Sequence, residues 1–219
     1  GEELSVSATD PGFATDAPAW CQRQGHEVLE NYRDNGTVVV KMKKNEAPQQ
    51  QSERQPATQS DPRSTKKTMV VFSGDLDRVI AAFVIANGAV AMGDEVTMFF
   101  TFWGLNALRR EDPPAVEKGL IDRMFGRMMP RGAKRLKLSQ MNMLGMGTAM
   151  MKKVMQDKQV DSLPALIDSA CKNGVKLVAC SMSMNVMGIA KEELIDGIEE
   201  GGVASFLGES DQAGTTLFI

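Results

Sequence analysis

The chain has few of the side chains on which most catalytic sites depend. Its 219 residues include one histidine, His26, and three cysteines, Cys21, Cys171 and Cys180. A Ser-His-Asp or Cys-His arrangement would have to use His26 alone, and a metal site would have to rely on carboxylates or thioethers. Three cysteines without C-x-x-C spacing build neither a disulfide framework nor a zinc cluster by themselves. We therefore expect no metal site.

Other signals are missing as well. Lys and Arg number 25 against 28 Asp and Glu, and the pI is 5.4, so the positive surface that nucleic-acid binding requires is not expected. No basic segment followed by an apolar run opens the chain, which predicts a cytoplasmic protein with reduced thiols. No G-x-G-x-x-G motif follows an expected strand, so a dinucleotide is not indicated and no cofactor is expected.

The side chains that are present, 42% hydrophobic and 24% charged, are typical of a soluble globular protein. The pattern changes at residues 45–65, NEAPQQQSERQPATQSDPRST, which hold three prolines, five glutamines and nothing more apolar than Ala or Pro. Such a segment cannot bury a core. We therefore expect a flexible linker there, between a small segment, residues 1–44, and a main domain, residues 66–219.

Residues 1–44 have the pattern of a small α/β unit. ELSVSATD alternates like a strand, FATDAPAWCQRQG is typical of a helix, and HEVLENYRDNGTVVVKMKK indicates a hairpin that turns at Asp34-Asn35-Gly36. The run SATDPGFATDAPAWCQRQGHEVL, followed by NGTVVVKMKK, resembles the second half of a TusA-type sulfur-carrier domain. The sulfur-bearing Cys-Pro-x-Pro motif of that family belongs to the first half and does not occur here. The resemblance therefore implies a partial TusA-like segment, the tail of a longer fusion, in which Cys21 is structural.

Residues 66–219 alternate between expected strands and helices. TMVVF, EVTMFFTFW, VKLVACSMSM and TTLFI are expected strands, and SLPALIDSACKNG and KEELIDGIEEGG are expected helices. A further helix follows TMVVF, and its buried face is expected to hold Ile80, Phe83, Val84, Asn87 and Val90. Its unbroken apolar run, residues 79–86, is too short to span a bilayer.

This alternation predicts an α/β fold, a mainly parallel flavodoxin- or Rossmann-like sheet with helices on both faces. Ligands of such sheets bind at the carboxyl ends of the strands. Ser73, Trp103 and Cys180 all lie at the carboxyl ends of expected strands. The sequence therefore places its candidate site at one edge of the sheet.

Two long runs carry a second resemblance. VVFSGDLDRVIAAFVIANGAVAMGDEVTMFFTFWGLNAL, together with KLVACSMSMNVMGIAKEELIDGIEEGGVASFL and the terminal LFI, resembles the DsrE/DsrF-like superfamily in its peroxiredoxin-like DsrE subgroup. The resemblance covers nearly all of residues 67–219. It implies a homo-oligomer that works in sulfur relay and that carries sulfane sulfur on a cysteine after a central strand. Cys180 stands at that position.

Cys180 is thus the expected catalytic residue. A sulfur-carrying thiolate needs hydrogen-bond donors or positive charge, for which Arg78 and Lys191 are further candidates. The pocket is expected to be formed by Ser73, Gly74, Asp75 and Trp103 after the earlier strands, and by Ser181, Met182 and Ser183 after Cys180. The alternative is that Cys180 packs as a small hydrophobe. Cys171 is expected to be structural, because its helix should leave it at the far end of the strand from Cys180.

An insertion at about residues 111–160 holds nine of the sixteen methionines. MFGRMMPRGAKRLKL is basic and broken by Pro130, whereas SQMNMLGMGTAMMKKVMQ is expected to be helical with Met143, Met146, Met150 and Val154 on one side. Methionine-rich surfaces suit partners or soft ligands such as Cu(I), and methionine also fills irregular cores. We expect the insertion to cap the carboxyl edge of the sheet or to form an oligomer contact. A lid or a membrane-surface contact stays open.

Three function classes follow from these observations. The first is a sulfurtransferase or sulfur carrier that holds a persulfide on Cys180 and passes sulfur to a TusA-like or rhodanese-like partner. The second is a noncatalytic oligomeric adaptor of a sulfur-transfer complex in which Cys180 is only packed. The third is a thiol peroxidase, which ordinarily needs a P-x-x-x-T/S-x-x-C pattern that LVACSMS lacks. No nucleic-acid partner is expected.

Overall fold

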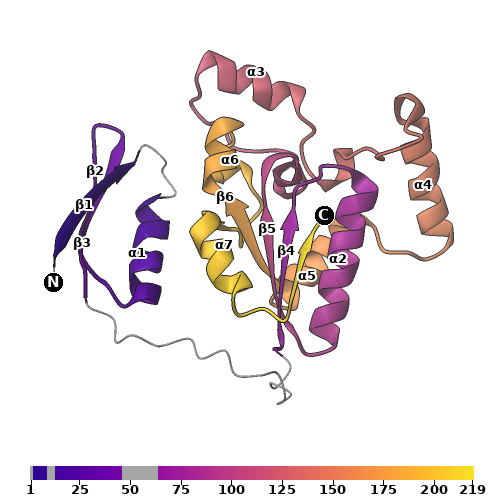
Figure 1. The fold of residues 1–219 in the computed structure, drawn as a ribbon. Helices are drawn as coiled ribbons and strands as arrows, with labels where there is room; N and C mark the ends of the chain where they lie inside the picture. Colours follow the sequence, from indigo (N-terminus) through magenta and orange to yellow (C-terminus); the bar gives the residue numbers. More distant parts are fainter. Residues whose placement is uncertain (1, 9–12, 46–63) are drawn as a thin grey trace. The chain divides into compact units, whose positions relative to one another are not determined.

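The computed structural model describes residues 2–8, 13–45 and 64–219. Its contacts divide the chain into two units, residues 1–64 with 201–212 and residues 65–200 with 213–219 (Figure 1). Most of the expected linker, residues 46–63, lies outside the described residues. Among the helices of the described part, none is long and apolar enough to cross a membrane.

The N-terminal unit is a helix packed on a small antiparallel sheet. The unit consists of strand β1 (Glu3–Ala8), helix α1 (Phe13–Gln24), strand β2 (Glu27–Asp34) and strand β3 (Thr37–Lys43). The three strands pair in the order β1-β3-β2. The expected hairpin is confirmed: Asn35 and Gly36 connect β2 and β3 with positive φ angles of 46° and 81°. The buried core of the unit consists of Ala17, Cys21, Val38, Val40 and Met42.

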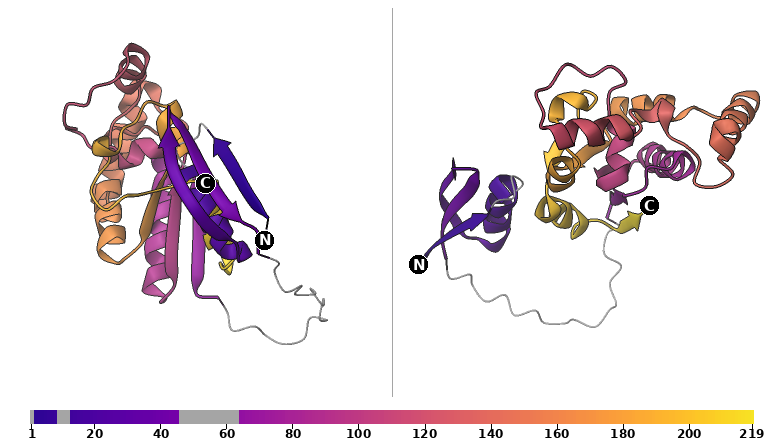
Figure 2. Two further views of the ribbon diagram at one scale, coloured as in Figure 1. Left: turned by 90° about the vertical axis from the view of Figure 1, so that its left-hand side faces the viewer. Right: turned by 90° about the horizontal axis from the view of Figure 1, so that it is seen from above.

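The C-terminal unit contains a five-stranded sheet flanked by helices, which confirms the predicted α/β class and adds one strand, β7, to the four expected ones. The strands are β4 (Lys66–Val71), β5 (Glu95–Phe100), β6 (Lys176–Cys180), β7 (Glu199–Gly201) and β8 (Thr215–Phe218), in the order β7-β6-β5-β4-β8. The pairings β8-β4, β4-β5 and β5-β6 are parallel. Helices α2 (Leu76–Ala91) and α5 (Leu163–Lys172) pack against each other and contribute to the main core (Figure 2).

Shorter elements connect the strands. They are η1 (Phe102–Leu108), α3 (Leu120–Met128), η2 (Ala133–Arg135), η3 (Met143–Gly145), α4 (Met146–Asp157), α6 (Ser181–Val186), η4 (Lys191–Glu193) and α7 (Val203–Ser210). Helix α7 groups with the N-terminal unit, whereas the strand after it, β8, belongs to the sheet.

The strand register determines which residues lie next to one another at the carboxyl edge of the sheet. Val71 of β4 pairs with Phe100 of β5, and Phe100 pairs with Ala179 of β6. These three residues are buried in the main core. The residues that follow them, Phe72, Thr101 and Cys180, therefore stand at the same level at the end of the sheet.

The buried face of α2 differs from the expected one. The buried residues are Leu76, Val79, Ala82, Phe83 and Ala86, whereas Val84 is half exposed. The amide of Asn87 lies toward α5, because it donates to the carbonyl oxygens of Phe83 and Leu166 at 2.9 and 3.0 Å. This side of the helix forms the polar contact with α5, and the neighbouring side faces the core.

The expected strand EVTMFFTFW is also shorter than predicted. Strand β5 ends at Phe100, and the chain turns into η1 with a positive φ of 45° at Phe102. The cause is a close contact: a Cβ atom added to Gly104 would lie 2.1 Å from the carbonyl oxygen of Val71. Only glycine lets η1 lie this close to the end of β4. Trp103 consequently lies in a helical turn and not on a strand.

The expected helix KEELIDGIEEGG is wrong. Only Lys191–Glu193 form a helical turn, Leu194 bridges to Arg109, and Glu199–Gly201 form β7. The reason is the burial of Glu193, whose carboxylate lies 3.5 Å from both Arg109 and Arg131 and also pairs with Lys118. A regular helix on the surface would not carry this carboxylate into the cluster.

This ion cluster is a buried structural element. Glu193 is 3% exposed and Arg109 is 2% exposed, and the Ala190 amide donates to Glu193 at 3.0 Å. Burial alone would raise the pKa of Glu193, but the hydrogen bonds from Lys118 and Ala190 and the charges of Lys118 and Arg109 lower it overall. Burial lowers the pKa of Arg109, and Glu193 opposes that change. The carboxylate therefore neutralises a guanidinium that would otherwise be buried without a counter-charge.

Glu193→Gln should lower the free energy of unfolding by about 3 kcal/mol at neutral pH, because it leaves Arg109 buried without its carboxylate. Since folding lowers the pKa of Glu193, this stability is present above the ordinary value of 4.5 and is lost as pH falls through the lower folded pKa. Urea denaturation from neutral to acidic pH measures the difference between the two proteins. Glu199→Gln is the matched control, because its ion pair with Lys176 is exposed. An equal cost for both variants at neutral pH would contradict the assigned role.

Candidate functional site at the carboxyl edge of the sheet

The loop after β4 is a compact, hydrogen-bonded turn. The Ser73 hydroxyl donates to Asp75 Oδ2 and accepts from the Asp75 amide, both at 3.1 Å. The amides of Phe72 and Ser73 donate to the carbonyl oxygen of Ile219, just past the end of β8, at 2.8 and 3.2 Å. Arg78, one turn into α2, lies 3.6 Å from Asp75. The ends of β4 and β8 and the start of α2 are thereby held together.

Gly74 and Trp103 lie where η1, the helical turn after β5, contacts this turn. A Cβ atom at Gly74 would lie 2.9 Å from the carbonyl oxygen of Trp103. Real Cβ atoms do not approach backbone oxygen so closely, so a larger residue would push η1 away from the turn. Trp103 itself is 51% exposed.

The residues expected after the first two strands line one pocket. Its volume is about 580 Å³. It is lined by Phe72, Ser73, Gly74, Asp75, Arg78, Trp103, Asn106, Met128, Met129, Pro130, Arg135 and Lys137. We call it the edge pocket. The structure thus brings Ser73, Gly74, Asp75 and Trp103 together, and adds cations of the Met-rich insertion that the sequence had not connected with them.

Cys180 is not among the residues that line the edge pocket. It ends β6, caps the amino end of α6 and is 1% exposed. Neighbouring strands lie about 4.8 Å apart, so the ends of β4 and β6, on either side of β5, are about 10 Å apart. The expected single pocket is therefore divided between two places along the edge.

The residues after Cys180 differ in exposure. Ser183 is fully buried, and its hydroxyl lies 2.7 Å from the Thr101 hydroxyl, which ties α6 to the end of β5. Met182 is exposed, and Ser181 is half-buried. Lys191 forms an ion pair with Glu200 at 3.1 Å. Of the two cations considered at the sequence level, Arg78 lines the edge pocket and Lys191 does not.

The other two thiols have contrasting surroundings. Cys21 is buried and donates to Met42 Sδ at 3.6 Å, and burial raises its pKa. Cys171 is exposed and lines a cavity of about 470 Å³ that also contains Arg110. Partial burial and the neighbouring Asp168 carboxylate raise the pKa of Cys171. Cys171 is thus accessible, but its environment disfavours the thiolate.

The helical phase alone does not predict the exposure of Cys171. Leu163, Leu166, Ile167 and Ala170 form the buried face of α5. On a helix, Cys171 lies about 100° from Ala170 but only about 40° from Ile167, which is at the border of this face.

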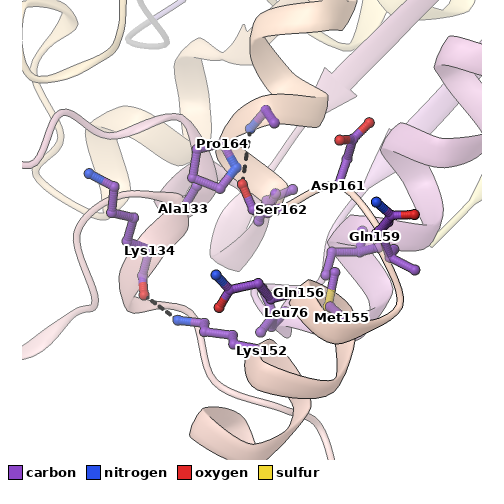
Figure 3. A pocket seen from close by; sticks show the side chains of 14 residues that line it. Leu76, Ala133, Lys134, Lys152, Met155, Gln156, Gln159, Asp161, Ser162 and Pro164 are labelled. Atoms are coloured by element: carbon purple, nitrogen blue, oxygen red, sulfur yellow. Dashed lines mark hydrogen bonds between the residues drawn. The ribbon is translucent and has the colours of Figure 1, made fainter.

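A larger pocket of about 720 Å³ lies beside helices α4 and α5 (Figure 3). Lys152 of α4 donates to the carbonyl oxygen of Lys134 at 2.7 Å, and the Ala165 amide donates to Ser162 Oγ at 3.5 Å (Figure 3). The first bond fastens α4 to η2. The second caps the amino end of α5. None of the predicted site residues lines this pocket.

The Met-rich insertion is only partly packed. Met129, Ala133 and Leu136 join the main core, whereas Met146, Met150 and Val154 of α4 are exposed. Met143 lies in η3 and is exposed as well. The expected apolar stripe of α4 is thus present, and within the described residues nothing buries it.

Comparison with known proteins identifies what the chain is similar to. Residues 64–218 match the DsrE/DsrF/DrsH-like family, and residues 1–44 match sulfurtransferase TusA, which confirms both resemblances. The protein YrkE of Bacillus subtilis (strain 168) is 50% identical over 157 residues, which cover 72% of this chain and 98% of YrkE. The sulfur carrier protein DsrE2 of Allochromatium vinosum is 37% identical over 153 residues, which cover 67% of this chain and 94% of DsrE2.

A solved structure also matches. The ychN protein from E. coli aligns with a TM-score of 0.40 and 14% identity, over 70% of this chain and 99% of ychN.

The three thiols should react with an alkylating reagent in the order of their exposure. Cys171 should be modified first, and Cys21 and Cys180 should react only as the structure opens, because both are buried. Brief treatment of the native protein with N-ethylmaleimide, followed by peptide mass spectrometry, measures the order. The same treatment in denaturant is the control in which all three thiols react alike. Modification of Cys180 before Cys171 would show that the sulfur of Cys180 is accessible in solution.

Proposed function

Because the chain belongs to the DsrE/DsrF/DrsH-like family, we propose that it works in sulfur relay and that Cys180 carries the sulfane sulfur as a persulfide. The observation that carries the proposal is the position of Cys180 at the end of β6, at the edge where parallel sheets hold their ligands. Two similarities support it: a relative is named a sulfur carrier protein, and residues 1–44 match a sulfurtransferase.

The chemistry needs one nucleophilic sulfur and an exchange of S–S bonds. The Cys180 thiolate attacks the outer sulfur of a donor persulfide, a new S–S bond forms, and the donor leaves as a thiolate that takes up the proton released by Cys180. In the second step an acceptor thiolate attacks the outer sulfur on Cys180, and the Cys180 thiolate leaves. No net oxidation occurs. The acceptor we propose is a TusA-like or rhodanese-like thiol protein.

The burial of Cys180 has a consequence for this cycle. Its sulfur is covered in the structure, so donor and acceptor reach it only after the start of α6 moves. Helix α6 has six residues, and its Met182 and Val186 side chains are exposed. The buried residues of α6 are Ser183 and Met184, and opening so short a helix breaks fewer contacts than opening a core strand or a long helix. We therefore assign the opening to α6, while the Thr101–Ser183 hydrogen bond closes it again.

The burial of Cys180 also favours a second candidate function. If Cys180 never becomes accessible, the chain acts as a noncatalytic adaptor that brings sulfur-transfer proteins together. In that case the exposed surfaces would mediate its function, and the cysteine would serve only as a packed side chain.

Incubation with a persulfide donor should add one sulfur atom to the Cys180 peptide. The gain should vanish in Cys180→Ser and persist in the double variant Cys21→Ser/Cys171→Ser, because the proposal assigns the sulfur to one thiol. Intact-protein and peptide mass spectrometry measure the product, and circular dichroism shows that each variant folds. A folded Cys180→Ser protein that still passes sulfur to a TusA-like acceptor would establish the adaptor in place of the carrier.

We further propose that the exposed stripe of α4 forms a contact between copies of the chain. Exposed apolar side chains in a row are typical of interfaces. Replacing Met146, Met150 and Val154 by Gln should leave the free energy of unfolding of the protomer within about 0.5 kcal/mol per site, because these side chains are exposed. The same variant should sediment as a smaller species than the wild type. Lys153→Gln on the same helix is the control, and unchanged sedimentation of the triple variant would place any self-association elsewhere.

A further inference from the structure

The edge pocket has a charge opposite to that of the whole chain. Its lining includes three cations, Arg78, Arg135 and Lys137, and one carboxylate, Asp75, so its formal charge is 3 − 1 = +2. The chain as a whole carries −3. Arg78 comes from the first turn of α2, whereas Arg135 and Lys137 come from η2 and the segment directly after it, far later in the sequence. Convergence of like charges from separate segments opposes folding unless something compensates it.

The cations are held in place by buried neighbours. Ala133 and Leu136 are buried in the main core, which anchors the segment that carries Arg135 and Lys137. The Leu76 amide donates to the carbonyl oxygen of Lys137 at 2.8 Å. Two residues later, the Ser139 amide and hydroxyl donate to Asp77 at 2.9 and 2.6 Å. The segment is thus tied to the start of α2 at Lys137 and at Ser139, and the backbone that carries the cations is held before any ligand arrives.

The charge of the pocket is only partly compensated by the protein. Asp75 is shared between Ser73 and Arg78. Within the part of the chain that the structure describes, neither the Arg135 nor the Lys137 side chain has a hydrogen-bonding or acidic partner. Asp77, the other acidic residue of this region, is occupied by Ser139. Two cations therefore remain for a ligand.

Much of the remaining lining, beside Ser73, Gly74 and Asn106, is apolar or aromatic. Phe72, Met128, Met129 and Pro130 contribute to it together with the exposed indole of Trp103. A volume of about 580 Å³ lies within the roughly 300–1,000 Å³ range of small-molecule sites and far exceeds a single oxyanion. The matching ligand has a doubly negative head group for Arg135 and Lys137 and a flat apolar body for Trp103.

We propose that the edge pocket binds a small organic dianion, a phosphate monoester or a dicarboxylate, with its charged group on Arg135 and Lys137 and its body against Trp103. Arg recognises both head groups because its planar guanidinium forms paired hydrogen bonds with two oxygens. This site is separate from Cys180 and goes beyond the sulfur-carrier proposal. It requires neither an accessible Cys180 nor sulfur transfer.

The fluorescence of Trp103 can be used to measure binding to the edge pocket. Trp20→Phe leaves Trp103 as the only tryptophan, and its fluorescence then reports on the pocket. Phenyl phosphate and phthalate are the two probes, since both are dianions with a ring and they differ in head group. The titrations are made in about 150 mM salt, where the Debye length is about 8 Å and general attraction is screened. Saturable binding of either probe is expected, and the tighter one identifies the head group.

Two double variants, each of which loses two positive charges, distinguish binding at the site from general electrostatic attraction. Arg135→Gln/Lys137→Gln should weaken binding about tenfold or more, because the charge-assisted hydrogen bonds are lost. Lys153→Gln/Lys158→Gln is the control, since these two exposed lysines, on α4 and at its carboxyl end, do not line the edge pocket. It should leave the affinity unchanged. Inorganic phosphate, which lacks the ring, should bind at least about threefold more weakly than phenyl phosphate because it cannot stack on Trp103.

The outcomes are distinct. No saturable binding of phenyl phosphate or phthalate, or equal weakening in both variant pairs, would overturn the site. Inorganic phosphate as tight as phenyl phosphate would overturn the assignment of an organic ligand. Circular dichroism confirms that the variants fold. Because Cys180→Ser should bind the probes as the wild type does, loss of sulfur transfer in that variant leaves this inference intact, and the two proposals fail independently.

Discussion

The parallel register of β4, β5 and β6 is the constraint on which the rest of the C-terminal unit depends. Val71, Phe100 and Ala179 are aligned across the three strands and buried in one core, so the strands end at the same level. A slip of one residue in any strand would turn its buried side chains to the other face of the sheet. The hydrophobic core thereby fixes where the segments after these three strands begin. Cys180 and the loop residues of the edge pocket lie at these starting points.

Two glycines allow the segments at this edge of the sheet to pack closely against one another. Gly104 lets η1 cross the end of β4 at backbone contact, and Gly74 lets the following turn approach Trp103. The indole is thereby brought beside a loop that follows a different strand. The Met-rich insertion completes the edge pocket from the other side, because the burial of Leu136 directs the neighbouring Arg135 and Lys137 away from the core. Backbone contact and core packing, together with the hydrogen bonds that tie Ser73 to Asp75 and Lys137 to α2, assemble the pocket.

The sequence predicted the features that depend on local pattern. The β2–β3 hairpin, helices α2 and α5, strand β8 and the α/β class follow from turn residues and periodicity. It failed where a distant contact decides the local structure. Residues 191–202 do not form a helix because Glu193 belongs to a cluster with Arg109, and β5 ends early because Gly104 contacts β4. For the candidate site, strand ends could be predicted, but not which of them share a pocket. That depends on strand order, since β5 lies between the loops of Ser73 and Cys180.

The separation of Cys180 from the edge pocket bears on how a sulfur carrier can work. A persulfide loses its sulfur to any small thiol that reaches it, so a carrier gains from keeping the sulfur covered between transfers. Cys180 is covered, whereas the pocket about two strands away is open to small molecules. The Thr101–Ser183 hydrogen bond connects the two places, because Thr101 precedes η1 and Trp103 while Ser183 lies in α6. If filling the pocket moved η1, this hydrogen bond would transmit the movement to α6. A ligand that binds more tightly when α6 is open would promote exposure of Cys180, and by linkage the exposure of Cys180 would promote binding by the same factor.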